Sequence, residues 1–154
     1  MEVRRAGNRD EEAVADLIVR TKRLNNEFDP LFSVVEDAAQ RALSYVQASL
    51  RNPAVLLMVA SEGGKVTGVL RGEIRDRLFY EPSREGFITD FYILPKYRRR
   101  ALGHSMLDKA TQELRRMGAQ IIVAEVPTRN EIAHSFYSKR GFRSIVQHYG
   151  LDRQ

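Results

Sequence analysis

The sequence contains no cysteine. This absence excludes a disulfide bond, a thiolate metal ligand and a cysteine nucleophile, and it fits a cytoplasmic enzyme. The chain also lacks any apolar run close to the roughly 20 residues that a helix needs to cross a bilayer. Residues Met1 to Arg5 do not form the apolar segment of a secretory signal. We therefore expect a cytoplasmic protein that has no membrane partner.

Two common phosphate-binding signatures are absent as well. The chain has neither the glycine-rich turn of a dinucleotide-binding fold nor the Gly-Lys-Ser/Thr sequence of a P-loop. The three histidines, His104, His134 and His148, share no metal-ligand spacing with carboxylates. We therefore predict no catalytic metal.

What the chain does contain is typical of a globular protein: 154 residues, of which 43% are hydrophobic and 29% charged. This length fits a single domain, residues 1–154, with a substantial core. The formal net charge of +5 would suit nucleic acid, a membrane surface or an anionic small molecule. Arginine is scattered along the chain, however, and only Arg98 to Arg100 form a run of three. Scattered charge is typical of a solvated surface, so we predict no nucleic-acid partner.

Hydrophobic periodicity predicts an α/β fold. Strands are expected at residues 3–6, 55–60, 66–75, 87–94, 121–126 and 143–151. Helices are expected at residues 10–25, 36–50, 102–117 and 130–140. The order β-α-α-β-β-β-α-β-α-β indicates a mixed central sheet with helices on both faces, containing an antiparallel hairpin and then a parallel crossover. Residues 76–86 are charged and contain a proline, which predicts a loop or a frayed strand end.

The chain is organised around residues 87–104, where a hydrophobic strand passes through a basic turn into an amphipathic helix. The first N–H groups of a helix have no partner within the helix, and the helix dipole favours negative charge there. A strand, a basic turn and a helix start in this order therefore predict a site for a phosphorylated cofactor.

This turn resembles a known family. Residues Arg98 to Gly103 are similar to the Arg/Gln-x-x-Gly-x-Gly/Ala pyrophosphate loop of the GNAT superfamily of acyl-CoA-dependent N-acyltransferases. Upstream, Ile93 to Arg98 resemble the strand end that leads into this loop. Downstream, Asn130 to Phe142 resemble the family pattern Asn-x-x-Ala-x-x-Phe-Tyr-x-x-x-Gly-Phe. The resemblance implies the GNAT fold, with a mostly antiparallel sheet, and the transfer of an acetyl group from acetyl-CoA to a primary amine of a small molecule or protein.

The resemblance also implies where acetyl-CoA binds. Its pantetheine arm would lie along the strand end and bond backbone groups of Phe91, Tyr92 and Ile93 like an added strand. Its pyrophosphate would lie at the turn and the helix start, which comprise Arg98, Arg99, Arg100, Ala101, Leu102, Gly103 and His104. Asn130 should cap the last helix. Asn130 and Tyr137 should both contact the cofactor.

Ala101 departs from the family loop, because it stands at the first glycine position. Alanine is strained at positive φ. We therefore predict an ordinary helical start at Ala101, which leaves the amides of residues 99–104 available to the pyrophosphate.

Two residues are the catalytic candidates. Direct attack of an amine on a thioester expels a thiolate, and a phenol beside the sulfur can protonate it; the family motif places Tyr137 in that role. Asp90 is an acidic residue within an apolar strand, so it is either the base that deprotonates the amine or the partner of a nearby arginine. Glu73, Glu85 and ordered water are alternative bases.

Two further functional questions stay open. The acceptor region is expected at residues 25–37, whose acidic residues would attract an amine or be ordinary loop residues. The alternative function is a CoA-binding module without catalysis.

Dimerisation is common in this superfamily, and the predicted last strand, around residues 145–149, could pair between subunits in a homodimer.

Overall fold

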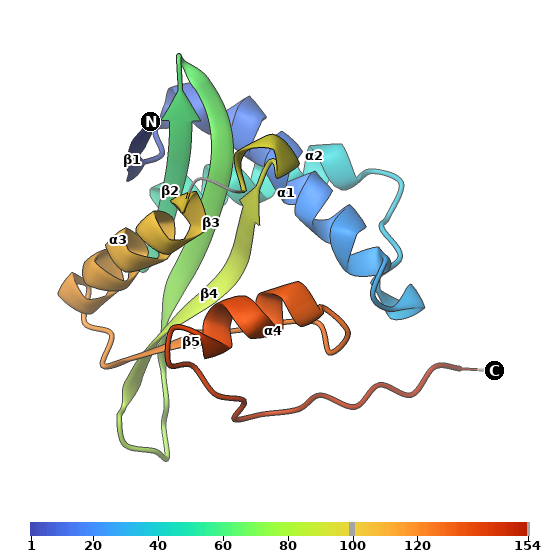
Figure 1. The fold of residues 1–154 in the computed structure, drawn as a ribbon, viewed down its shortest axis with the longest axis vertical. Coiled ribbons are helices and arrows are strands. Elements are labelled where there is room, and N and C mark those ends of the chain that lie inside the picture. Colours follow the sequence, from blue (N-terminus) through green and yellow to red (C-terminus); the bar gives the residue numbers. More distant parts are fainter. Residues whose placement is uncertain (99–100, 154) are drawn as a thin grey trace.

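The computed structural model describes residues 1–98 and 101–153. Its elements follow the predicted order up to the last helix (Figure 1). The strands are β1 (Glu2–Arg5), β2 (Val55–Glu62), β3 (Lys65–Asp76), β4 (Arg84–Ile93) and β5 (Ile121–Ala124). The helices are α1 (Glu11–Asn26), α2 (Ala38–Arg51), α3 (Leu102–Arg116) and α4 (Glu131–Ser138).

The strands form one sheet in the order β1-β2-β3-β4-β5. The first three pairings are antiparallel, whereas β4 and β5 are parallel because α3 connects them as a crossover. The fold class is therefore confirmed: a mixed, mostly antiparallel sheet of the α/β type.

The two faces of the sheet bury separate cores. Helices α1 and α2 pack on one face against Val59, Val69 and Tyr92. Helix α3 packs on the other face against Leu70 and Ile88, and α4 lies beside it on the same side (Figure 1). The prediction of helices on both faces is thus confirmed.

Helix α3 lies close to the sheet because β3 and β4 carry glycines beneath it. A methyl group on Gly72 would be 3.2 Å from a Leu114 methyl carbon, and one on Gly86 would be 3.1 Å from Leu114 Cβ. Any larger residue at these positions would push the helix outward. The helix ends where the sequence predicts, since Gly118 takes a φ of +110° beyond its last turn.

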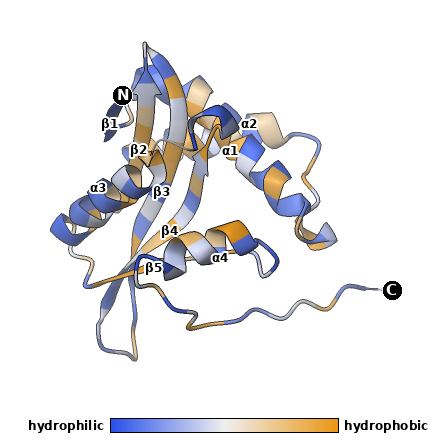
Figure 2. Cartoon of the chain, viewed as in Figure 1, coloured by the Kyte–Doolittle hydropathy of each residue, from blue (hydrophilic) through white to orange (hydrophobic). Residues whose placement is uncertain are grey.

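The segment 76–86, predicted as a loop or a frayed strand end, contains both: β3 and β4 reach Asp76 and Arg84, which pair with each other, and a short loop joins them. One sequence prediction about the sheet is wrong. The last strand, predicted at residues 143–151, does not form: described residues after Phe142 have no regular secondary structure. Figure 2 shows blue and orange stretches along this tail, so apolar residues do recur in it. A strand also needs a neighbouring edge to pair with, and the tail runs away from the sheet (Figure 1).

Candidate active site

The central feature of the site is the open edge of β4. Strand β5 pairs only with Glu85 to Ile88, although β4 continues to Ile93. Beyond Ile88, no strand among the described residues covers this edge. The second half of β4 therefore has a free backbone edge on the side away from β3.

The ladder with β3 decides which residues present backbone groups at the open edge. The Leu94 N–H donates to the Thr67 carbonyl at 2.9 Å, and Tyr92 pairs with Val69 two residues earlier. Because backbone groups alternate between the two sides of a strand, Tyr92 faces β3 whereas Phe91 and Ile93 face the open edge. The Ile93 carbonyl already accepts a hydrogen bond from Arg98 Nε at 2.7 Å.

The N-terminus of α3 lies directly after this strand. Among the described residues, the first backbone hydrogen bond of this helix start is donated by the Ser105 N–H to the Ala101 carbonyl, at 3.2 Å. Ala101 supplies no side-chain cap, so the N–H groups of Leu102 and Gly103 have no partner among the described residues. These amides and the helix dipole favour an anion here.

Ala101 contradicts the prediction made for it. Its φ of 55° and ψ of 16° are left-handed, not those of an ordinary helical start. The turn into α3 requires this conformation. A glycine, which the family loop has at this position, would adopt it without strain. An alanine there is less stable by about 1–2 kcal/mol.

Arg98 and His104 flank the α3 N-terminus. The Arg98 guanidinium lies 5.1 Å from the centre of the Tyr92 ring, in addition to its hydrogen bond to Ile93. His104 Nδ1 accepts from Arg140 Nε at 3.0 Å, and its Nε2 lies 3.2 Å from an Asp108 oxygen. Both ring nitrogens of His104 are therefore engaged. Arg99 and Arg100 lie outside the described residues.

A row of aromatic rings connects the open edge of β4 to α4. The Phe91 ring meets that of Phe136 edge to face at 5.8 Å, and Phe136 meets Tyr137 at 5.3 Å. Tyr137 in turn meets Phe142 at 5.1 Å. These contacts hold Tyr137 on the same side of β4 as α3.

The Tyr137 hydroxyl is free to act on a ligand. It makes no hydrogen bond with a described residue, and it is not among the polar atoms sealed from solvent without a partner. Burial of the ring raises the pKa of Tyr137 above its usual value. The phenol therefore stays protonated at neutral pH and can donate a hydrogen bond.

Two contacts, one at its N-terminus and one with α3, hold helix α4 in place. The Asn130 side chain accepts a hydrogen bond from the Ala133 N–H at 3.1 Å, which confirms its predicted capping role. At the α3 end, a methyl group on Gly103 would stand 3.1 Å from Phe136 Cε1. Gly103 thus permits α4 to lie close to the N-terminal end of α3.

A β-bulge interrupts β4 just before its open half. In the pairing of β3 with β4, Asp90 lies opposite Arg71 and Ile88 lies opposite Gly72. Thr89 is therefore an extra residue, with no residue opposite it in the β3 ladder. Ile88 packs in the core under α3, but Thr89 and Asp90 both point toward α1 and α2. Bulges are frequent beside active sites, where they redirect a side chain.

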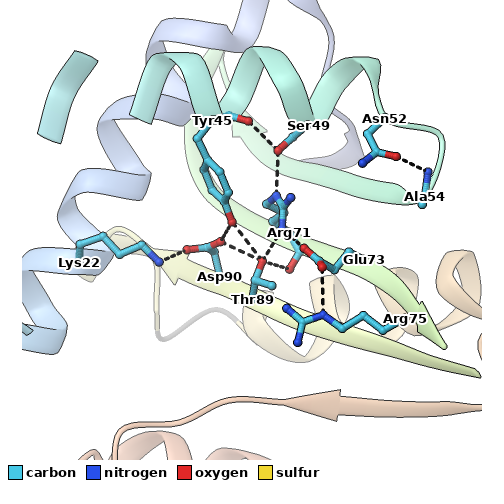
Figure 3. A network of polar contacts seen from close by, with 10 residues as sticks. All are labelled: Lys22, Tyr45, Ser49, Asn52, Ala54, Arg71, Glu73, Arg75, Thr89 and Asp90. Carbon is cyan, nitrogen blue, oxygen red and sulfur yellow. Dashed lines mark hydrogen bonds and ion pairs between the residues drawn. The ribbon is translucent and has the colours of Figure 1, made fainter. Parts of the chain in front are cut away.

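The Asp90 carboxylate is the centre of a polar network on this face (Figure 3). It is fully buried and accepts from Lys22 Nζ and the Tyr45 hydroxyl, each at 2.7 Å. Thr89 Oγ1 lies 2.9 Å from the same carboxylate and 3.0 Å from Arg71 Nη1. Three hydrogen-bond donors thus surround Asp90, and its ionic partner is a lysine and not an arginine.

The network continues along β3. Arg71 Nε donates to Ser49 Oγ at 2.8 Å, and Arg71 Nη1 donates to Glu73 at 2.7 Å. Arg75 Nε donates to the other Glu73 oxygen at 2.9 Å. Burial raises the pKa of Glu73, but these hydrogen bonds outweigh it and hold the pKa below its usual value. The pKa of Tyr45 is raised by burial and by the charge of Asp90.

The structure brings most of the predicted site together, but on two faces of β4. Tyr137 and Asn130 lie on the α4 side, whereas Asp90 and Glu73 lie on the α1–α2 side. Glu85 is paired with Arg77, 3.7 Å away near the far end of the strand. Sequence reasoning missed Lys22 and Tyr45, since neither belongs to a motif; the buried Asp90 was the one signal that a partner was needed.

Two acidic residues of the predicted acceptor region, residues 25–37, already have partners. Asp29 accepts from the Leu31 N–H at 2.9 Å and so caps the short turn at Pro30–Phe32. Asp37 is paired with Arg41 at 2.8 Å. Both carboxylates are therefore already engaged.

Other parts of the described chain offer no competing site. A hollow of about 630 Å³ lies near β1 and the start of α1, where several charged side chains pair with each other, as Arg4 does with Asp10 and Arg20 with Asp16. Within residues 1–98 and 101–153, no group of three or more His, Asp or Glu side chains could hold a metal ion. None of the helices described is long and apolar enough to cross a membrane.

Comparisons with known proteins agree with this geometry. The sequence profile of the acetyltransferase (GNAT) family matches residues 21–142. An aminoalkylphosphonate N-acetyltransferase of Salmonella typhimurium is 27% identical over 142 residues, which cover 92% of this chain and 84% of the relative.

Solved structures share the fold at lower identity. An aminoglycoside 6'-N-acetyltransferase of Acinetobacter haemolyticus superposes with a TM-score of 0.79 at 17% identity, over 100% of this chain and 99% of that one. A predicted acetyltransferase of Clostridium acetobutylicum, solved with acetyl-CoA, gives a TM-score of 0.80 at 19% identity, over 98% and 95% of the two chains.

Proposed function

Because this chain belongs to the acetyltransferase (GNAT) family, we propose that it transfers the acetyl group of acetyl-CoA to the primary amine of an acceptor by direct attack. The observation that carries this proposal is the open edge of β4, near the α3 N-terminus and the Tyr137 hydroxyl, which has no partner among the described residues. Together these features offer a backbone edge, an anion site and a proton donor.

The residues fit the parts of acetyl-CoA. The free backbone groups of Phe91 and Ile93 suit the amide-bearing pantetheine arm, which can bond to a strand edge. The amides of Leu102, Gly103 and His104, with Arg98 beside them, suit the pyrophosphate. The same proposed pyrophosphate loop includes Arg99, Arg100 and Ala101. We propose that Asn130, at the start of α4, contacts the cofactor from the α4 side.

Acetyl-CoA supplies an activated thioester, so that a C–N bond forms as the C–S bond breaks, while the nitrogen loses a proton and the sulfur gains one. The Phe91 N–H faces the open edge, where it can donate to the oxyanion that develops on the carbonyl. The Tyr137 hydroxyl donates its proton to the departing sulfur. Because its pKa is raised, it would give up that proton only as negative charge builds on the sulfur.

The amine is deprotonated on the other face of β4. Asp90 is the predicted base, but its carboxylate already accepts from Lys22, Tyr45 and Thr89. A carboxylate has about four acceptor positions. Asp90 therefore acts through a remaining position or a bound water, which carries the proton to solvent.

Turnover with acetyl-CoA and a panel of primary amines tests this function. Because the chain has no cysteine, any free thiol that appears comes from CoA, so thiol release reports the reaction without background from the protein. We expect release that depends on the amine. Thermal stabilisation by CoA without turnover on any amine would favour the alternative, a CoA-binding module.

We also propose a homodimer formed through the tail at residues 143–153. The tail leaves Ile145, Val146, Tyr149 and Leu151 exposed, although its Gly150 passes next to Leu31. Exposed backbone and apolar side chains in an extended segment suit pairing with a second copy. Sedimentation of the full chain tests this, and a monomer at micromolar concentration would exclude it.

A further inference from the structure

We propose that the acceptor carries a negatively charged group, a carboxylate or a phosphonate, and that the ammonium group of Lys22 binds it. This inference rests on the proposed acetyl transfer and specifies the acceptor that the same site takes. It is argued from the polar network around the β4 bulge (Figure 3).

The network presents positive charge outward. It contains three cations, Lys22, Arg71 and Arg75, and two acids, Glu73 and Asp90, so its formal balance is 3 − 2 = +1. The side chains of Lys22 and Arg75 are 45% and 43% exposed, whereas that of Asp90 is 0% exposed. The Glu73 side chain, 28% exposed, is also less accessible than either cation, so an incoming acceptor meets mainly the cations.

Lys22 retains hydrogen-bonding capacity for a ligand. A lysine ammonium has three N–H donors, and Asp90 is the one acceptor that Lys22 has among the described residues. Asp90 is itself held by Tyr45 and Thr89, so it fixes the direction of the Lys22 side chain. The ammonium is thus oriented before a ligand binds, which lowers the entropy cost of binding.

The position of Lys22 suits an acceptor with its amine and its anion at opposite ends. Lys22 binds Asp90, and the next residue, Phe91, presents its backbone at the open edge. Tyr137 lies on the other face of β4. An anion held at Lys22 therefore places the amine of a short acceptor toward the thioester, on the face opposite the proton donor.

Several acidic residues that would attract a polycation are already engaged, although the exposed Glu27 and Glu36 have no side-chain partner among the described residues. Asp29 caps a turn, Asp37 pairs with Arg41, and Glu73 pairs with two arginines. A polyamine or an aminoglycoside would bring further positive charge toward Lys22 and Arg75. Like charges at this separation repel each other, so such acceptors should be poor substrates.

Matched acceptors test the inference directly. We would compare kcat/KM for 2-aminoethylphosphonate, β-alanine, propylamine and spermidine. The expected result is a preference of about tenfold or more for one or both anion-bearing amines over propylamine, as for a partly exposed charged hydrogen bond. The phosphonate and β-alanine arms tell which anion is preferred. Equal turnover of propylamine, or better turnover of spermidine, would overturn the inference while leaving the acetyltransferase function standing.

Variants separate anion binding from stability. Lys22→Met should lower the ratio of kcat/KM for the anion-bearing amines to kcat/KM for propylamine about tenfold. Lys22→Met alone leaves the buried Asp90 unpaired, whereas the double variant Lys22→Met/Asp90→Asn removes both charges. Because Asp90 is the proposed base, the double variant should acetylate every amine more slowly, but the ratio between the acceptors must show the same loss of preference. If the double variant recovers the preference, the effect came from the unpaired carboxylate and the inference is wrong. Lys65→Met, an exposed lysine at the start of β3, is the matched control and should keep the preference.

No turnover on any amine has a different meaning. If CoA still raises the melting temperature, this result overturns the proposed transfer reaction, and the inference with it.

Discussion

Gly103 and Phe136 lie so close together that a methyl group added at Gly103 would stand 3.1 Å from the Cε1 atom of Phe136. This contact joins the start of α3, where the pyrophosphate is proposed to bind, to the ring cluster that holds Tyr137. The spacing between the proposed anion site and the proposed proton donor therefore depends on a residue without a side chain.

The first prediction concerns this contact. Gly103→Ala should shift the Phe136 ring by a few tenths of an ångström, and the edge-to-face contact would carry the shift to Tyr137. Because alanine also favours a helix by about 1 kcal/mol, the overpacking and propensity effects offset each other and stability should change little. Activity should nevertheless fall several-fold, since the cost of misplacing a reacting group is steep. Steady-state kinetics and urea unfolding measure the two effects, with Ser105→Ala on the same helix turn as the control.

The second prediction concerns proton donation. Tyr137→Phe should lower kcat about 100-fold or more, because it removes the hydroxyl that would protonate the departing sulfur. The KM for acetyl-CoA should change little, since the ring and its contacts with Phe136 and Phe142 remain. Tyr149→Phe, in the exposed tail, serves as the control. An unchanged kcat in the Tyr137 variant would rule out the acid role.

The third prediction concerns backbone strain at Ala101. Ala101→Gly relieves the left-handed conformation but adds flexibility to the unfolded chain. The net gain in the free energy of unfolding should be about 0.5–1 kcal/mol. Ala13→Gly, at an exposed position inside α1, should instead lose about 1 kcal/mol, because glycine disfavours an ordinary helix. Opposite signs in urea unfolding support the strained turn; a loss at both positions contradicts it.

The fourth prediction concerns stability in acid. Asp10 is buried and accepts from two Arg4 nitrogens, at 2.7 and 3.0 Å, and from the Gly7 N–H at 2.8 Å. The Arg4 hydrogen bond holds the pKa of Asp10 below its ordinary value of 3.8, although burial opposes this. A depressed folded-state pKa contributes stability above the unfolded pKa, and that stability is lost as the pH falls through the folded pKa.

Asp10→Asn should therefore cost about 2–3 kcal/mol at neutral pH. The difference from the unchanged protein should shrink below about pH 4. Thermal unfolding between pH 2 and 7 measures it. Asp152→Asn, in the tail, should show no comparable difference, and a constant difference for Asp10→Asn at all pH values would exclude the ionic contribution.

The sequence predicted those features that local chemistry determines. The asparagine that caps α4 and the glycine that ends α3 were both found, because each fills a backbone requirement that few other residues meet. The two motifs likewise indicated the family and the strand–turn–helix order of the site. Tyr137 became the candidate proton donor from these motifs alone, and that role stays a prediction.

Features that depend on contacts between distant segments were missed. Lys22 and Tyr45 lie 68 and 45 residues from Asp90 in the chain, and nothing local distinguishes them from other helix residues. The conformation of Ala101 is imposed by the turn between β4 and α3, which overrides the preference of alanine. The last strand failed for a related reason: alternation of side chains describes one chain segment, but a strand also requires a second one beside it.

The extra residue Thr89 has a consequence for how this enzyme family could diversify. Because it reverses the facing of side chains within β4, the proposed acceptor contacts come from α1 and α2, whereas the proposed cofactor and acid contacts come from α3 and α4. Substitutions that alter acceptor choice can then accumulate on one layer without disturbing the chemistry of the other. A designer who wished to change the acceptor could therefore vary positions around Lys22 and Tyr45 and keep the remaining half of the molecule fixed.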